Sequence, residues 1–83
     1  MYHLYILRCA DDTLYTGIAR DLDRRLVEHN ASKLGAKYTR SRRPVRLVYA
    51  RVYSNRSAAL RAEAATKKLK RRQKLALIDD YAA

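Results

Sequence analysis

Two tyrosines and an arginine follow one another at intervals of ten residues near the start of the chain, as Tyr5, Tyr15 and Arg25. A tyrosine hydroxyl can position or deprotonate a water molecule, but its usual pKa of about 10 means that it needs nearby cations or a metal to act as a base at neutral pH. A guanidinium can bind two oxygens of a phosphate at once. Taken singly, the tyrosines are also explained as half-buried strand residues, and Arg25 as the i, i+4 partner of Asp21.

Two further residues could take part in the same chemistry. His29 lies four residues after Arg25, where it could carry a proton or contact a phosphate, but near a helix end it is equally well explained as a charge that complements the helix dipole. Glu63 stands alone among cations, and its ordinary explanation is an i, i+4 ion pair with Lys67. These five positions acquire a joint meaning only if the fold brings them together.

The elements that must position these residues can be predicted from the chain. Residues 2–9 and 13–18 are rich in aromatic and aliphatic side chains and are separated by the polar residues 10–12, which predicts a β-hairpin. Asp21 can cap a helix that continues, with apolar residues at helical spacing, to about residue 31. Both tyrosines are therefore expected on the hairpin, and Arg25 and His29 on the helix.

The second half of the chain begins with a basic loop at residues 32–44, which can include a helical turn, and continues as a third strand at residues 45–53. From residue 54 onward neither Gly nor Pro occurs, which predicts a helix capped by Ser54, Asn55 or Ser57 and a second apolar group near the end that can form a separate helix. The face expected to pack on the sheet consists of Ala58, Ala62, Ala65 and Leu69. The predicted fold is α+β, with a three-stranded antiparallel sheet flanked by helices in a single domain of residues 1–83.

The composition of the chain limits the class of protein and the kinds of partner it can have. The chain has 83 residues, a formal net charge of +11 and 48% hydrophobic residues, which argues against a disordered basic tail. One cysteine and two histidines are too few for a disulfide or a Cys/His zinc site. The apolar runs are too short for a membrane helix or a signal peptide, so we expect a cytoplasmic protein without a membrane partner. The charge favours nucleic acid as a partner, with a solvated basic surface, ribosome association or acidic proteins as alternatives.

An ordered set of motifs covers essentially the whole chain, and it closely resembles the GIY-YIG nuclease superfamily and, within it, the small stand-alone UPF0213 or YhbQ-like group. The motifs are Leu4-Tyr5-Ile6-Leu7-Arg8-Cys9, Leu14-Tyr15-Thr16-Gly17-Ile18, Asp21-Leu22-x-Arg24-Arg25-Leu26-x-Glu28-His29, Gly35-Ala36-Lys37-Tyr38-Thr39-Arg40, Arg42-Arg43-Pro44-Val45-Arg46-Leu47-Val48 and Arg56-Ser57-Ala58-Ala59-Leu60-Arg61-Ala62-Glu63.

The resemblance implies a divalent-metal-dependent endonuclease that hydrolyses phosphodiester bonds by in-line attack of water. In this reading Tyr5 and Tyr15 activate the water, Arg25 stabilises the charged phosphorus centre and His29 assists. Glu63 would hold a single divalent cation, with Mg²⁺ favoured and Mn²⁺ as the alternative. DNA is favoured over RNA, cleavage would be structure-directed or nonspecific, and the role would be DNA repair or nucleic-acid processing.

The residues expected to contact nucleic acid lie in the basic loop and in the helical half, and they are Gly17, Lys37, Tyr38, Arg40, Arg42, Arg43, Lys67 and Lys68, with Lys70, Arg71, Arg72 and Lys74 extending the helical group. Tyr38 is expected to offer a base-stacking platform and Gly17 a turn or a close approach to substrate. Ile18 stands where several active family members carry a lysine, and a late asparagine of many members has no counterpart. The alternative function is therefore a non-catalytic nucleic-acid-binding module with the same fold.

Overall fold

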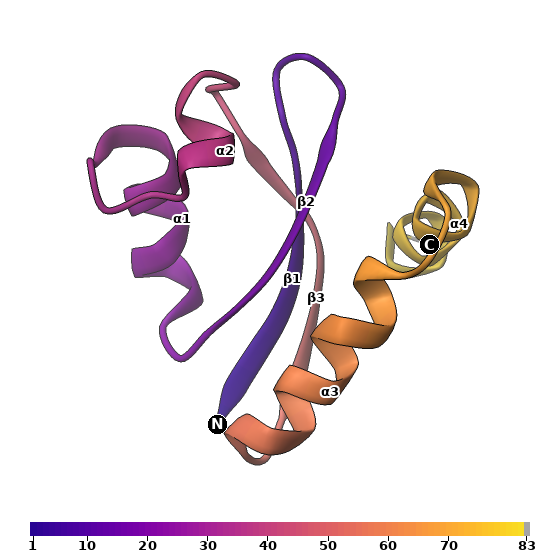
Figure 1. The fold of residues 1–83 in the computed structure, drawn as a ribbon. Helices are drawn as coiled ribbons and strands as arrows, with labels where there is room; N and C mark the ends of the chain where they lie inside the picture. Colours follow the sequence, from indigo (N-terminus) through magenta and orange to yellow (C-terminus); the bar gives the residue numbers. More distant parts are fainter. Residues whose placement is uncertain (83) are drawn as a thin grey trace.

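A three-stranded antiparallel sheet with helices on both faces makes up the fold (Figure 1), in a computed structural model that describes residues 1–82. The elements are β1 (Tyr2–Arg8), β2 (Leu14–Ala19), α1 (Leu22–Ala31), α2 (Lys37–Arg40), β3 (Arg46–Tyr53), α3 (Arg56–Lys67) and α4 (Arg71–Ala82). The predicted α+β class, the hairpin and the third strand are confirmed, and the basic loop contains the short helix α2.

The sheet has the order β2-β1-β3, so the strand that carries Tyr5 lies at its centre. The hairpin register places Tyr5 opposite Gly17 and Leu7 opposite Tyr15. The turn is closed by a hydrogen bond from the Cys9 amide to the Thr13 carbonyl, 2.9 Å long, and by Asp12, whose φ of 70° lies in the left-handed region that aspartate tolerates. Local turn chemistry therefore fixes which residues face one another across the hairpin.

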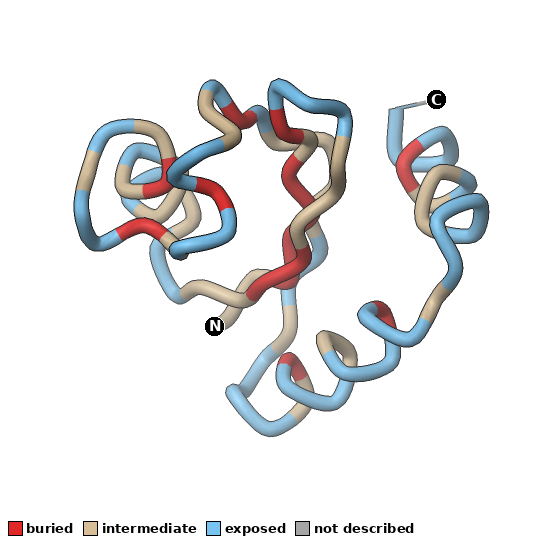
Figure 2. The backbone as a smooth tube through the Cα atoms, turned by 45° about the horizontal axis from the view of Figure 1, so that its top comes forward, coloured by how far each residue is buried: buried red, intermediate tan, exposed pale blue. Residues whose placement is uncertain are grey.

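Each face of β1 is covered by a different pair of helices. On one face the buried Tyr5, Leu7 and Cys9 pack against Leu22 and Leu26 of α1. Alternation along the strand turns Leu4 and Ile6 toward the other face, where α3 and α4 cover the sheet. Figure 2 shows the buried positions concentrated along the central strands, between the two helical layers. Tyr5 is thus the polar member of the α1 side of the core.

The face of α3 that packs on the sheet differs from the predicted one. Ala59 and Thr66 are buried, and Ala58, Ala62 and Leu69 of the predicted stripe are half-buried. Ala65 is exposed, so the packed face is shifted to one side of the stripe. Thr66 can be buried because its hydroxyl donates a hydrogen bond to the Ala62 carbonyl, 2.7 Å away, which satisfies its polar group within the helix. Asn55 caps α3 by accepting from the Ala58 amide at 2.8 Å, which confirms one of the three predicted caps.

The chain end forms a separate helix, as the second apolar group indicated. α3 ends at Lys67, and Gln73 accepts the Lys70 amide at 2.8 Å to begin α4. Within residues 1–82, the helices are too short or too polar for any of them to cross a membrane.

Candidate active site

Tyr5 and Gly17 face one another at the centre of the sheet. The Tyr5 side chain is only 1% exposed, and a Cβ placed on Gly17 would lie 2.6 Å from its hydroxyl oxygen. Gly17 lies within a strand and its φ is not positive, so it provides space for the Tyr5 ring and makes no turn. The expected turn at Gly17 is therefore wrong. The hairpin register, which pairs the glycine with a tyrosine, is the sequence signal that could have revealed this role.

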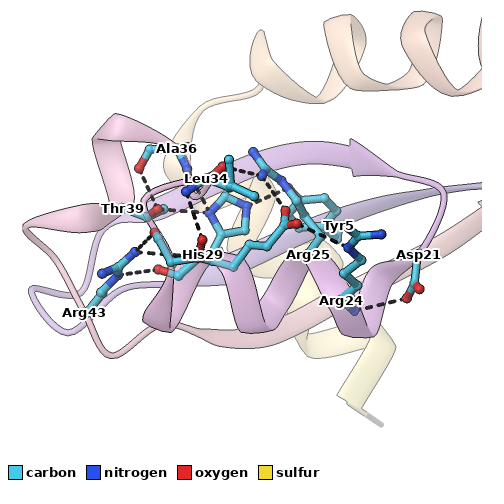
Figure 3. A network of polar contacts seen from close by, with 11 residues as sticks. Tyr5, Asp21, Arg24, Arg25, His29, Leu34, Ala36, Thr39 and Arg43 are labelled. Atoms are coloured by element: carbon cyan, nitrogen blue, oxygen red, sulfur yellow. Dashed lines mark hydrogen bonds and ion pairs between the residues drawn. The ribbon is translucent and has the colours of Figure 1, made fainter.

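The Tyr5 hydroxyl begins a short buried hydrogen-bond chain (Figure 3). It lies 2.8 Å from Nε2 of His29, and Nδ1 of His29 lies 3.0 Å from the Thr39 hydroxyl. Because Thr39 donates its own proton to the Ala36 carbonyl at 2.9 Å, it accepts from Nδ1–H, which leaves Nε2 to accept from Tyr5. A longer approach of the Ala36 amide to Nδ1, at 3.4 Å, is the weaker competitor. Thr39 is fully buried and was not predicted as a site residue.

Burial keeps both partners of this hydrogen bond neutral. Burial, followed by the positive charge of Arg25, lowers the pKa of the His29 imidazole from 6.5 to about 4, although Glu28 opposes the shift. Burial also raises the pKa of the Tyr5 hydroxyl to about 12, against the opposing effect of the Arg25 guanidinium beside it. His29 is 0% exposed and uncharged at neutral pH, so it neither complements the helix dipole with a charge nor contacts solvent.

Arg25 is held beside Tyr5 by contacts other than the pair with Asp21 that was its alternative explanation. Its Nη1 donates to Glu28 Oε1 at 2.9 Å and to the Leu34 carbonyl at 2.7 Å. Asp21 instead caps α1 by accepting the Arg24 amide at 3.0 Å, as predicted for the helix start. The Arg25 side chain is 28% exposed, so its guanidinium lies at the border between the buried chain and solvent.

Tyr15 is fixed by a stack of side chains from the hairpin and the basic loop. Its ring centroid lies 6.5 Å from that of Tyr5, 5.3 Å from that of His29 and 5.9 Å from that of Tyr38. The Arg42 guanidinium lies 4.0 Å from the Tyr38 ring centroid, and an ion pair of 3.0 Å joins it to Asp11 at the hairpin turn. Tyr38 is exposed, and it already contacts Tyr15 and Arg42 within the protein.

Glu63 reaches the same region from α3. Its side chain is 19% exposed, its carboxylate lies 3.4 Å from the Lys67 ammonium, and its negative charge contributes to the raised pKa of Tyr5. Residues 1–82 contain no cluster of three His, Cys, Asp or Glu side chains able to hold a metal. A lone carboxylate still suits Mg²⁺, which typically keeps several waters and takes its remaining ligands from substrate phosphates. The donor set therefore fits a weakly held Mg²⁺ or Mn²⁺ and excludes a closed metal cage.

Some of the cations predicted to contact nucleic acid are exposed, and others form hydrogen bonds within the protein. Lys37, Arg40 and Lys68 are exposed. The Arg43 guanidinium instead donates to three backbone carbonyls, those of His29 at 2.6 Å, Ser32 at 2.6 Å and Glu28 at 3.3 Å. These carbonyls lie at the C-terminal end of α1, where the Glu28 and Ser32 carbonyls also accept backbone amides, so Arg43 adds donors to this helix end.

Comparison with known proteins identifies the family of the chain. Residues 1–76 match the GIY-YIG catalytic domain family. A UPF0213 protein of Syntrophus aciditrophicus (strain SB) is 51% identical over 92% of this chain and 87% of its own length. A UPF0213 protein of Streptococcus pyogenes serotype M5 (strain Manfredo) is 57% identical over 92% of this chain and 83% of its own length.

Two solution NMR structures have the same fold. One, of a UPF0213 protein from Bacillus halodurans, has a TM-score of 0.61 and 45% sequence identity, and it covers 95% of this chain and 84% of that one. The other, of a protein from E. faecalis, has a TM-score of 0.65 and 42% identity, and it covers 98% of this chain and 85% of that one. The chain therefore belongs to the GIY-YIG family and, within it, to the UPF0213 group.

Proposed function

We propose that the chain is a divalent-metal-dependent endonuclease that hydrolyses phosphodiester bonds of nucleic acid by in-line attack of water. The observation that carries the proposal is the hydrogen bond between Tyr5 and His29, which lies beside the Arg25 guanidinium and within the electrostatic influence of Glu63. Strongly shifted pKa values on neighbouring residues, beside a cation, are typical of functional sites.

The two tyrosines have different tasks in this proposal. Tyr15 is half-buried and orients the attacking water together with Tyr5. The Tyr5 hydroxyl donates its proton in a hydrogen bond to Nε2 of His29, which leaves the Tyr5 oxygen to accept from the attacking water, and Arg25 stabilises negative charge on that oxygen. His29 acts through Tyr5 and is thus a positioning residue that does not itself contact substrate.

Arg25 and Glu63 complete the site around the phosphate. The Arg25 guanidinium, held by Glu28 and the Leu34 carbonyl, would bind oxygens of the scissile group. A divalent cation on Glu63, Mg²⁺ in preference to Mn²⁺, supplies further charge neutralisation at the phosphate when bound. We propose DNA in preference to RNA as the substrate, products with 5′-phosphate and 3′-hydroxyl ends, and a role in DNA repair or nucleic-acid processing.

The test is cleavage of labelled single-stranded, double-stranded, nicked and branched DNA and RNA in Mg²⁺, Mn²⁺ or EDTA. We expect cleavage that requires metal and is lost in Glu63→Gln and in Arg25→Gln. Asp80→Asn, which removes one negative charge at an exposed position of α4, is the matched control for Glu63 and should cleave normally. Cleavage that persists in Glu63→Gln or in EDTA contradicts the proposal. Binding without cleavage of any substrate would identify the chain as a nucleic-acid-binding module.

A further inference from the structure

A groove of about 240 Å³ lies where the hairpin, α2 and α4 meet. It is lined by Thr13, Leu14, Tyr38, Arg71 and Lys74, which come from three distant parts of the sequence. In Figure 1 the β1–β2 hairpin stands between α2 and α4, so the groove joins the basic loop to the start of the last helix. Its two cations belong to the helical group, while Tyr38 belongs to the stack on Tyr15.

The positive charge at the groove exceeds the negative charge of the carboxylates that pair with it. Asp12 accepts from Arg71 at 3.2 Å and from Arg8 at 2.5 Å, so one carboxylate serves two guanidinium groups. This pair also directs the half-exposed Arg71 toward the hairpin. Lys74 lies three residues later on the same helical face, and within residues 1–82 it forms no ion pair. The groove is therefore suited to an anion.

The position of the groove identifies which anion. Tyr38 lines the groove and also stacks on Tyr15, whose ring contacts those of Tyr5 and His29. One aromatic ring thus separates the groove from the proposed catalytic centre. A nucleic-acid strand lying over Tyr15 would bring a neighbouring part of its backbone to Arg71 and Lys74.

The lining of the groove favours a phosphate. The Tyr38 ring already contacts Tyr15 and Arg42, and the charged groups that line the groove are the two cations Arg71 and Lys74. Two cations without a directional acceptor also match phosphate contacts, which position a strand without reading its sequence.

We propose that this groove is a subsite for a backbone phosphate of the strand being cut, bound by Arg71 and Lys74. The inference rests on the proposed nuclease function, because the phosphate is assigned to the strand being cut from the position of the groove beside that centre. In this proposal α4 holds the substrate directly, through contacts that do not read the nucleotide sequence.

The test is binding in EDTA, where no metal-dependent cleavage occurs. Fluorescence anisotropy of labelled 20-nucleotide single-stranded and duplex DNA would be titrated over a range of KCl concentrations with Arg71→Gln, Lys74→Gln and Lys74→Arg. We expect each Gln variant to weaken binding about 3- to 10-fold and to lower the slope of log K against log salt by about 1, because one phosphate contact is lost. Lys74→Arg should retain binding.

Arg56→Gln is the control, since it makes the same charge change at the exposed start of α3. Equal losses in Arg56→Gln and the groove variants, or no loss in the groove variants, overturn the subsite, as does a parent protein that binds neither probe. Inorganic phosphate that displaces DNA from the parent at low millimolar concentration and constant ionic strength, but not from Lys74→Gln, would indicate a free-phosphate site and also overturns it. Groove-specific binding losses in a chain that never cleaves would support the subsite and contradict the nuclease.

Discussion

The hydroxyl of Tyr5 and Nε2 of His29 lie 2.8 Å apart, and both residues are buried. Both groups are neutral at pH 7, the tyrosine because burial raises its pKa to about 12 and the histidine because burial lowers its pKa to about 4. The hydrogen bond to His29 therefore orients the Tyr5 hydroxyl oxygen, and changes to the residues that maintain this contact should affect both cleavage and stability.

Tyr5→Phe should separate catalysis from folding. The variant keeps the ring and removes the hydroxyl, so we expect cleavage to fall at least 100-fold, in the range typical for loss of an acid–base group. The unpaired Nε2 should lower the free energy of unfolding by about 1–3 kcal/mol. Single-turnover cleavage and urea unfolding measure the two effects, and Tyr53→Phe on β3 is the control. Wild-type cleavage by Tyr5→Phe would refute the assigned role.

Stability should decrease as the pH falls from about 6.5 to about 4. In this range the unfolded chain binds a proton at His29 and the folded chain does not, so protonation stabilises the unfolded state relative to the folded one. The full effect is about 3 kcal/mol, and it is present above pH 6.5 and lost as the pH approaches 4. Urea unfolding at several pH values measures it. His29→Gln should flatten the slope, and an unchanged slope in His29→Gln would contradict the prediction.

Gly17→Ala should act through Tyr5. The added Cβ would lie 2.6 Å from the hydroxyl oxygen and 2.8 Å from Cζ of Tyr5, so the ring must move and the variant should lose about 1–3 kcal/mol of stability and most cleavage. Because the backbone of Gly17 is compatible with alanine, replacing the ring as well removes the clash. The double variant Gly17→Ala/Tyr5→Leu should therefore be more stable than the sum of the two single effects. Strict additivity would show that the glycine serves another purpose.

Arg43 and Arg40 should behave in opposite ways. Arg43→Ala removes donors to three carbonyls at the end of α1, so we expect a stability loss of about 1–3 kcal/mol. Arg40→Ala removes an exposed charge and should leave stability within about 0.5 kcal/mol while weakening DNA binding. Thermal unfolding and anisotropy titrations on both variants give the comparison. If Arg43→Ala weakens binding more than Arg40→Ala at unchanged stability, the arginine contacts nucleic acid after all.

Local chemistry determines the parts of this fold that the sequence predicts well. The hairpin, the Asp21 and Asn55 caps and the end of α1 at Ala31 each depend on residues close together in the chain. The ten-residue spacing of the tyrosines places both on the face that packs against α1, because the hairpin register is set by its turn.

Contacts between distant segments account for what the sequence does not show. Thr39 is an ordinary polar residue in a basic loop until α2 packs on α1 and places its hydroxyl against His29. In the same way the buried face of α3 is chosen by the sheet, which accepts Thr66 and leaves Ala65 in solvent. No periodicity within the helix distinguishes these two positions.

The carboxylate of Asp12 would compete with the proposed substrate phosphate for the Arg71 guanidinium. A backbone phosphate that binds Arg71 must replace Asp12, whose ion pair with that guanidinium is already made in the free protein. Breaking this ion pair costs part of the free energy gained on binding. We therefore expect the strand to be held less tightly than the net charge of +11 would suggest. In the proposed nuclease, the Asp12–Arg71 ion pair would form again when the strand leaves, which would lower the free-energy cost of releasing it.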